Sequence, residues 1–241
     1  SNKNKKLINE NLKNINNFIS KKDNLKCGLI TKNYCPKNSN KIKKDERCFY
    51  TKENGLIIDT INDYINNKID NNLKYYILSQ LLIKASIHTN TSGIFKAFYK
   101  DKNTGIGIWG GTGQNALTRI KKTIKLDEII WNNTNTYTHH NFNEDINLLI
   151  KKLDNLDVIY LDPPYNQHPY GSNYFMLNLI TNNKMPENIS KISGIPTNWN
   201  RSNYNYKDSA IKSLTELLIL SSKISKYIIL SYNNEGIINN D

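Results

Sequence analysis

The sequence predicts an α/β protein in which a mainly helical first part precedes a parallel sheet. Apolar residues recur at helical spacing through much of the first 90 residues. Two short apolar runs, at residues 158–161 and 226–231, each follow a segment of helical character and end in polar residues. Near residue 136 the sequence pattern changes, and short apolar runs begin to alternate with segments of helical character. Because strands that alternate with helices pair in parallel, we expect the sheet in the last hundred residues.

The first part contains three expected helices. Residues 5–20 carry apolar side chains at steps of three and four, which is typical of an amphipathic helix. Residues 21–47 are polar and rich in Lys and Asn, which indicates a loop. Steps of four from Ile57 to Ile65 predict a second helix, and residues 71–89 a third. Since the third is apolar on several faces, we expect it to be well buried.

The later elements follow the same reasoning. Residues 91–125 are glycine-rich and basic, with aromatic residues among the lysines. A turn at residues 143–145 and a helix through Leu148–Leu153 precede the strand 158–161, which we expect to be buried. A polar loop follows, and a helix over 209–223 leads into a second buried strand.

The composition limits the classes of protein. With 241 residues, the chain suffices for one domain, or for one domain that carries a smaller inserted one. Lys and Arg number 33 against 21 acids, and the net charge of +12 is spread along the chain. Such a surface attracts nucleic acid. An AT-rich genome, which inflates Lys, Asn and Ile, is the alternative explanation of the charge.

Other classes have little support. The three cysteines lack paired C-x-x-C spacing, so we expect reduced, packed thiols in a cytoplasmic protein rather than disulfides or zinc ligands. The four histidines show no ligand spacing, and no metal site is expected. No apolar run approaches the ~20 residues of a membrane span, so no membrane partner is expected. The first ten residues lack the apolar core of a signal peptide.

The stretch Asp162-Pro163-Pro164-Tyr165 directly follows the first apolar run. In open α/β sheets, ligands bind outside the carboxyl ends of the strands. Proline fixes φ near about −65° and has no N–H, so two in a row predict a stiff loop. The Asp162 carboxylate and the Pro163 carbonyl would then be free acceptors beside the Tyr165 ring. This set suits a flat group that carries an NH2; a rigid turn that caps a strand is the alternative.

Methylation of a base amine needs such acceptors. The lone pair of the amine is delocalised into the ring, and two acceptors on its hydrogens favour a pyramidal, more nucleophilic nitrogen. Positioning and aimed acceptors suffice, without a strong base. S-adenosylmethionine would be the methyl donor. Within a duplex the base must be flipped out, and Tyr165 is the candidate stacking platform.

The segment YLDPPYNQHPYGSNYFMLNLI, residues 160–180, resembles motif IV of the DNA adenine-N6 methyltransferases of the Dam-like (D12) class. Four other segments resemble blocks of that class in the same order: ERCFYTKENGLIIDTI, HTNTSGIFKAFYK, SGIPTNWNRSNYN and YIILSYNNEG. The resemblance covers roughly residues 7–238. It implies a Rossmann-like S-adenosylmethionine-dependent methyltransferase sheet with a mainly helical target-recognition insert, of the restriction-modification type.

The resemblance also implies roles for single residues. Asp162, Pro163, Pro164 and Tyr165 match the catalytic motif, and Asp162 would also contact the donor. Asp145 matches the acidic position that approaches the adenosyl part of the donor; a helix N-cap is the alternative for it.

Residues after the motif are candidates for the flipped-base pocket or the DNA face, with ordinary surface as the alternative: Asn166, Tyr170, Asn173 and Tyr174. Residues 231–236, SYNNEG, would form a further wall of the active site or an ordinary polar turn.

Residues 1–40 are expected to be an incomplete N-terminal part of the catalytic domain, 41–135 the helical recognition and DNA-binding region, and 136–241 the catalytic domain. The family's Gly/Lys segment and F-x-G-x-G donor-binding loop are not found before residue 40. We therefore expect a fragment that lacks its first strand–helix unit and its last elements.

The glycine-rich stretch offers a second candidate for donor binding, since Gly105, Gly107 and Gly110 match G-x-G-x-x-G. A tight turn or a DNA-facing role is favoured, because the preceding residues are polar. Basic residues flank this stretch and could contact phosphates, or form a solvated basic face: Lys96, Lys100, Lys102, Arg119, Lys121 and Lys122.

We expect an enzyme that methylates adenine N6 in double-stranded DNA, with a cognate restriction endonuclease as a candidate partner. Cytosine-N4 methylation is the nearest alternative, although Ser more commonly replaces the Asp there. A catalytically inactive DNA-binding subunit, and methylation of RNA or of a protein glutamine, are the others.

Overall fold

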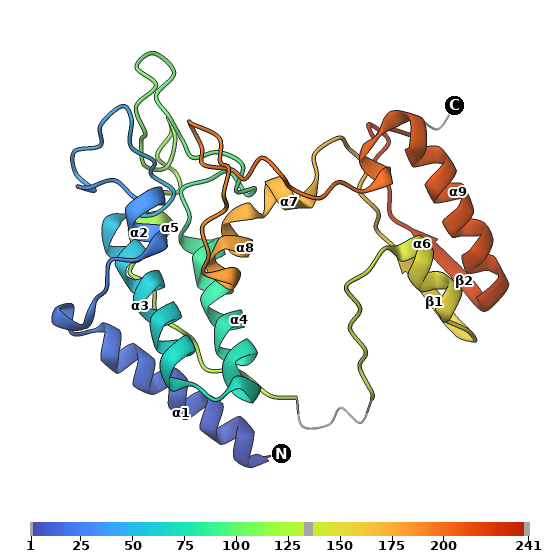
Figure 1. Ribbon diagram of the computed structural model, residues 1–241, viewed down its shortest axis with the longest axis horizontal. Coiled ribbons are helices and arrows are strands. Elements are labelled where there is room, and N and C mark those ends of the chain that lie inside the picture. The colour runs from blue at the N-terminus through green and yellow to red at the C-terminus, as the bar shows by residue number, and fades with distance from the viewer. Residues whose placement is uncertain (1, 133–136, 239–241) are drawn as a thin grey trace. The chain divides into compact units, whose positions relative to one another are not determined.

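The computed structural model describes residues 2–132 and 137–238, which group into two compact units (Figure 1). Unit 1 contains residues 2–132 and 172–198, and unit 2 contains residues 137–171 and 199–238. Residues 1–40 were expected in the catalytic domain, but those described lie in unit 1, where α1 contacts α3 and α4. Residues 172–198, expected in the last domain, also belong to unit 1. The functional division of the chain stays a prediction.

Unit 1 is built mainly from helices: α1 (Asn2–Ile19), η1 (Lys22–Asn24), α2 (Leu29–Tyr34), α3 (Lys52–Lys68), α4 (Asn71–His88), α5 (Leu117–Lys121) and α8 (Phe175–Asn182). Helices α1, α3 and α4 confirm the predictions from apolar periodicity. Thr51 and Asp70 start α3 and α4 by accepting hydrogen bonds from the backbone of the first turn. Helix α8 replaces part of the expected polar loop; its apolar face, with Phe175 and Ile180, is buried.

Two expectations about unit 1 were wrong. Residues 21–47 are not all loop, because α2 forms within them. The carboxylate of Asp59 on α3 accepts hydrogen bonds from the backbone N–H groups of Gly28, Ile30 and Thr31 and so stabilises the start of α2. Helix α4 is also less buried than its composition suggested, since Tyr75 is 77% exposed.

An aromatic cluster forms part of the core of unit 1. The buried Phe49 ring makes edge contacts with Tyr34, Phe98 and Phe175, with ring centroids 5.1–5.8 Å apart. These four residues come from segments that are far apart in the sequence. The cluster therefore ties α2, the loop before α3, the glycine-rich stretch and α8 together.

Unit 2 contains α6 (Ile146–Leu149), η2 (Ile150–Lys152), β1 (Leu156–Leu161), η3 (Asn203–Asn205), α9 (Lys207–Ile224) and β2 (Ser225–Leu230). Helix α7 (Tyr170–Asn173) lies where the chain passes from unit 2 to unit 1. Strands β1 and β2 pair in parallel, with Ile159 opposite Ile228, as expected for a strand–helix–strand arrangement. Among the described residues, these two strands are the whole sheet.

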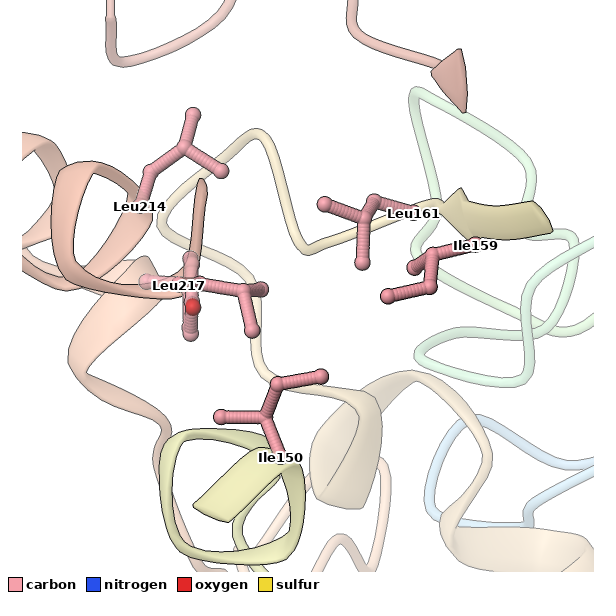
Figure 2. Close-up of a cluster of buried hydrophobic side chains, with 6 residues drawn as sticks. Ile150, Ile159, Leu161, Leu214 and Leu217 are labelled. Carbon is pink, nitrogen blue, oxygen red and sulfur yellow. The ribbon is translucent and has the colours of Figure 1, made fainter. Parts of the chain in front are cut away.

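One face of this sheet packs on helices, and the other is exposed. Ile159 and Leu161 point toward a cluster with Ile150, Leu214 and Leu217, which come from η2 and α9 (Figure 2). On the opposite face Tyr160 and Tyr227 are 63% and 68% exposed. The expectation that both strands are buried was therefore wrong, because helices cover only one face of the pair among the described residues.

Candidate active site

The loop Asp162–Tyr165 begins where β1 ends, at the carboxyl edge of the parallel pair. Its two flanks are held by hydrogen bonds within unit 2. The carbonyl of Leu161 accepts from the N–H of Ser231, just after β2, at 2.8 Å. The carbonyl of Tyr165 accepts from the N–H of Ile237, also at 2.8 Å. Since both ends are held and the prolines restrict the interior, the loop has little freedom to move.

The interior of the loop presents unused acceptors. Asp162 is exposed, whereas Pro163 is buried. Within residues 2–132 and 137–238, no donor reaches the Asp162 carboxylate or the Pro163 carbonyl. The free acceptors are as the sequence predicted, and their role in binding an amine stays a prediction.

An aromatic wall stands beside the acceptors. Tyr165 is 37% exposed, and its ring contacts that of Tyr232 edge-on, with centroids 6.4 Å apart and an interplanar angle of 77°. Gly236 allows this close approach: a Cβ there would lie 2.6 Å from the Tyr232 ring and 3.1 Å from the Tyr165 carbonyl. Tyr232 and Gly236 thus lie against the motif, and the role of residues 231–236 as a wall of the active site stays a prediction. The side chain of Tyr165 is thus only partly buried, and stacking of a flat ligand on its ring stays a prediction.

A hydrogen bond made by a residue of η3 holds the residue that follows the motif. Asn205 is buried, and its Nδ2 donates to the carbonyl of Asn166, the residue after the motif, at 2.8 Å. The adjacent Tyr204 donates its hydroxyl proton to Asn147 Oδ1 at 2.7 Å. Burial, together with the nearby charges of Asp145 and Glu216, raises the pKa of Tyr204. The tyrosine therefore stays a neutral donor at ordinary pH.

Asp145 serves as the N-cap of α6. Its Oδ1 accepts from the backbone N–H groups of Asn147 at 2.9 Å and Leu148 at 3.2 Å. This is the local role that the sequence offered as the alternative. The carboxylate is exposed, so the cap leaves its second oxygen accessible, and the contact with the donor stays a prediction.

The four residues expected at the base pocket or DNA face divide between the units. Asn166 and Tyr170 belong to unit 2, and Asn173 and Tyr174 to unit 1. Asn173 is buried, and its backbone carbonyl accepts from the N–H of Phe95 at 2.8 Å. The ring of Tyr174 lies 6.1 Å from that of Phe95. Their contacts with DNA stay predictions.

The three basic residues expected at DNA differ in their surroundings. Lys96 and Lys100 line a cavity of about 470 Å³ in unit 1, and the Lys100 ammonium lies 4.7 Å from the centre of the Phe98 ring. The guanidinium of Arg119 instead donates to carbonyls at the end of α4, including that of Thr89 at 2.9 Å. This gives Arg119 a structural role in capping α4, and a phosphate contact by it stays a prediction.

The glycine-rich stretch forms turns rather than a strand–loop–helix unit. Lys100 pairs with Gly107 in an antiparallel bridge, and Gly105 has φ +70° in the turn between them. Gly110 and Gly111 also have positive φ, which favours glycine. This is the tight-turn role that the sequence favoured over donor binding.

Sequence reasoning did not single out Tyr232 or Asn205. Tyr232 lies within the predicted wall, but its contact with Tyr165 depends on the pairing of the two strands. Asn205 lies 39 residues from the carbonyl that it binds. The S-x-x-N spacing at Ser202 and Asn205, which forms a capping box, was the available local signal.

The described residues also bear on the expectations about metals, cysteines and membranes. No group of His, Cys, Asp and Glu side chains among them could hold a metal ion. Cys35 and Cys48 are buried free thiols, as expected, but Cys27 is exposed rather than packed. None of the helices described is both long and apolar enough to cross a membrane.

Comparison with known proteins identifies the class. The family model of the D12 class N6 adenine-specific DNA methyltransferases matches residues 4–240. The chain is 32% identical over 218 residues to the type II methyltransferase M.NlaIII of Neisseria lactamica, covering 88% of this chain and 57% of that protein. It is 32% identical over 205 residues to the modification methylase StsI of Streptococcus sanguinis, covering 81% of this chain and 28% of that protein. No solved structure matches the chain.

The chain belongs to the D12 class of N6 adenine-specific DNA methyltransferases, which confirms the prediction from its motif IV. It spans little more than half of M.NlaIII and about a quarter to a third of the methylase StsI. M.CviAII of Paramecium bursaria Chlorella virus 1, a type II methyltransferase, is 26% identical over 228 residues, which cover 91% of this chain and 59% of that protein.

Proposed function

We propose that the protein containing this chain transfers a methyl group from S-adenosylmethionine to adenine N6 in double-stranded DNA, as the modification enzyme of a restriction-modification system. Family membership supports the activity, and the names of the relatives as methyltransferases and modification methylases support the setting. A cognate endonuclease would be its partner, and the cytoplasm its place of action.

The observation that carries the proposal is the pair of unused acceptors on a held loop. The Asp162 carboxylate and the Pro163 carbonyl would accept the two N–H groups of the adenine amine. Their hydrogen bonds localise the nitrogen lone pair and hold it in one position. Such fixed acceptors stabilise the transition state because they do not need to reorganise during the reaction.

Tyr165 would stack against the flipped adenine. Stacking of a base on an aromatic side chain contributes about 1–3 kcal/mol, which offsets part of the cost of extrusion. The edge contact with Tyr232 fixes the orientation of the ring. The two acceptors and the ring therefore act on the same base from two directions.

S-adenosylmethionine supplies an electrophilic methyl group on its sulfonium when it is bound. Within this chain, Asp162 and Asp145 are the residues that would contact it. Both are exposed carboxylates in unit 2, able to accept from its amine or ribose hydroxyl groups. In this proposal β1 and β2 are two strands of a Rossmann-like sheet, with Asp162 just after the end of β1 and Asp145 at the start of α6.

The proposal is tested with the full gene product, S-adenosylmethionine and unmethylated duplex DNA, followed by digestion to nucleosides and mass analysis. N6-methyladenine is expected from the wild type and not from Asp162→Ala. Asp157→Ala is the matched control, since Asp157 is an exposed acid on β1, the strand that precedes Asp162, and it pairs with Lys226. N4-methylcytosine, or no methyl transfer, would contradict the proposal.

A further inference from the structure

A cavity of about 420 Å³ in unit 2 is lined by two cations that have no part in the proposed chemistry at Asp162. Its lining consists of Gln167, Arg201, Asn205, Tyr206, Lys207, Gly236 and Ile237. We propose that Arg201 and Lys207 bind a backbone phosphate of the DNA next to the flipped nucleotide. This inference rests on the proposed function and names the residues that hold the substrate beside the active site.

The cavity adjoins the catalytic loop through direct hydrogen bonds. Ile237 donates its N–H to the carbonyl of Tyr165, and Asn205 donates to the carbonyl of Asn166. Gln167, which lines the cavity, is only two residues beyond Tyr165. An anion bound here would therefore lie beside the ring that is proposed to stack on the base.

The lining contains two positive charges and no acid. Arg201 and Lys207 are both exposed and form no ion pair with any residue in the described ranges. The acids nearest in sequence, Asp208 and Glu235, do not line the cavity. Two cations without a countercharge repel each other, so an anion between them is favoured.

The geometry of the cations suits a phosphate diester. The Arg201 guanidinium lies 5.8 Å from the centre of the Tyr206 ring, and this contact orients it at the rim. A guanidinium can give two parallel hydrogen bonds to phosphate oxygens, while a lysine adds a point charge. Because Arg201, Tyr206 and Lys207 are exposed, the site admits a continuous polymer backbone and does not enclose a small ligand.

The test measures DNA binding by the full gene product, not methyl transfer. Arg201→Gln, Lys207→Gln and the double variant are titrated with a duplex at several salt concentrations. Each single variant is expected to bind about tenfold more weakly. The double variant is expected to lower the slope of log affinity against log salt by ~0.9, the value for one lost phosphate contact, and each single variant by a part of this.

Lys223→Gln is the matched control. It removes the same charge from an exposed position on the same helix, sixteen residues further along, which is ~24 Å at 1.5 Å per residue. It is expected to leave the slope unchanged. Duplexes with a neutral methylphosphonate at single positions then locate the contact. The wild type should lose affinity at a phosphate adjoining the target adenine, and the double variant should lose none at that position.

The inference is overturned if the salt slope is unchanged, if Lys223→Gln has the same effect, or if no methylphosphonate position is sensitive. It is also overturned if the variants lose affinity for S-adenosylmethionine and keep that for DNA, since the cations would then hold the carboxylate of the donor. If the variants methylate adenine and bind DNA as the wild type does, this inference is wrong and the proposed function stands. If the variants lower the salt slope but the wild type transfers no methyl group, this inference stands and the proposed function is wrong.

Discussion

Removal of the Asp59 side chain is predicted to destabilise unit 1 strongly. Asp59 is 5% exposed and joins α3 to the start of α2. Its two carboxylate oxygens accept the backbone N–H groups of Gly28 at 2.9 Å, Ile30 at 2.9 Å and Thr31 at 2.8 Å. The alanine variant would leave three donors of a helix start without partners in a poorly hydrated site.

The expected cost follows from these bonds. A hydrogen bond to a charged acceptor contributes about 1.5–3 kcal/mol net. Three such bonds share one carboxylate and its desolvation, and water can reach the partly exposed Gly28, so the full sum is not expected. We therefore expect Asp59→Ala to lower the free energy of unfolding by about 3–6 kcal/mol. That is a large part of the roughly 5–15 kcal/mol typical of a domain.

Asp63→Ala is the matched control. Asp63 lies one turn later on the same helix and pairs with Lys26, so it holds a neighbouring point of the same segment. This pair is partly exposed, and such pairs contribute roughly 0–1 kcal/mol. Asp59→Ala should therefore cost at least three times as much as Asp63→Ala.

Urea unfolding of both variants measures the difference. For a denaturant slope of about 2 kcal/mol/M, the midpoint should fall by roughly 1.5–3 M for Asp59→Ala and by less than about 0.5 M for Asp63→Ala. Native-state hydrogen exchange of the Ile30 and Thr31 amides should also quicken in the first variant only. Equal midpoints, or unchanged exchange of these amides, would refute the role assigned to Asp59.

Four further outcomes are expected. Asn205→Asp replaces the donor to the Asn166 carbonyl, next to the candidate catalytic loop, by an acceptor and should lower kcat/KM for methyl transfer at least about tenfold. The exposed Asn203→Asp should not, and equal effects of the two variants would disprove the role of this hydrogen bond. Burial lowers the pKa of His88 below its ordinary value of 6.5, so the folded state favours the neutral ring. The free energy of unfolding should therefore fall as the pH drops below 6.5, and thermal scans of His88→Gln should show a smaller fall. Asn16→Asp should cost about 1–3 kcal/mol in urea unfolding, because it places an acceptor against a backbone carbonyl. In a thiol-labelling assay at pH 8, Cys27 alone should react before denaturation, and faster labelling of the buried thiols would contradict their burial.

Periodicity predicted the long helices because each of them buries an apolar face against its neighbours. In α1, Leu12 and Ile15 are fully buried, and this follows from their spacing alone. The same signal was present for α8 at Phe175 and Ile180, but the polar residues around it hid the short apolar face. Burial of the strands was predicted wrongly because an apolar run indicates a strand and does not show which of its faces is covered.

Bonds between distant residues explain what the sequence could not show. Residues 122–129 have no regular secondary structure, yet three asparagines hold their backbone. Asn9, Asn16 and Asn54 each donate to one carbonyl and accept from one N–H of this segment. An AT-rich genome would also explain the many asparagines, but these three have a structural role in unit 1. No local sequence pattern indicates which asparagines bind the backbone of a distant segment.

The loop Asp162–Tyr165 shows how sequence and fold contribute separately to one candidate site. Local chemistry predicted its stiffness, since proline restricts φ and donates no hydrogen bond. The bonds from Ser231, Ile237 and Asn205 that fix its flanks come from residues 39 to 72 positions away and need the fold.

The distribution of bonded and unbonded acceptors favours the proposed role of the motif, which stays a prediction, over a turn that only caps a strand. A turn that only caps a strand would use its acceptors on its own chain. Here the carbonyls of Leu161, Tyr165 and Asn166 are bonded, whereas the Asp162 carboxylate and the Pro163 carbonyl between them are not. A loop held on both sides with its central acceptors free is suited to receive two N–H groups from outside the chain, which is what methylation of an amine requires.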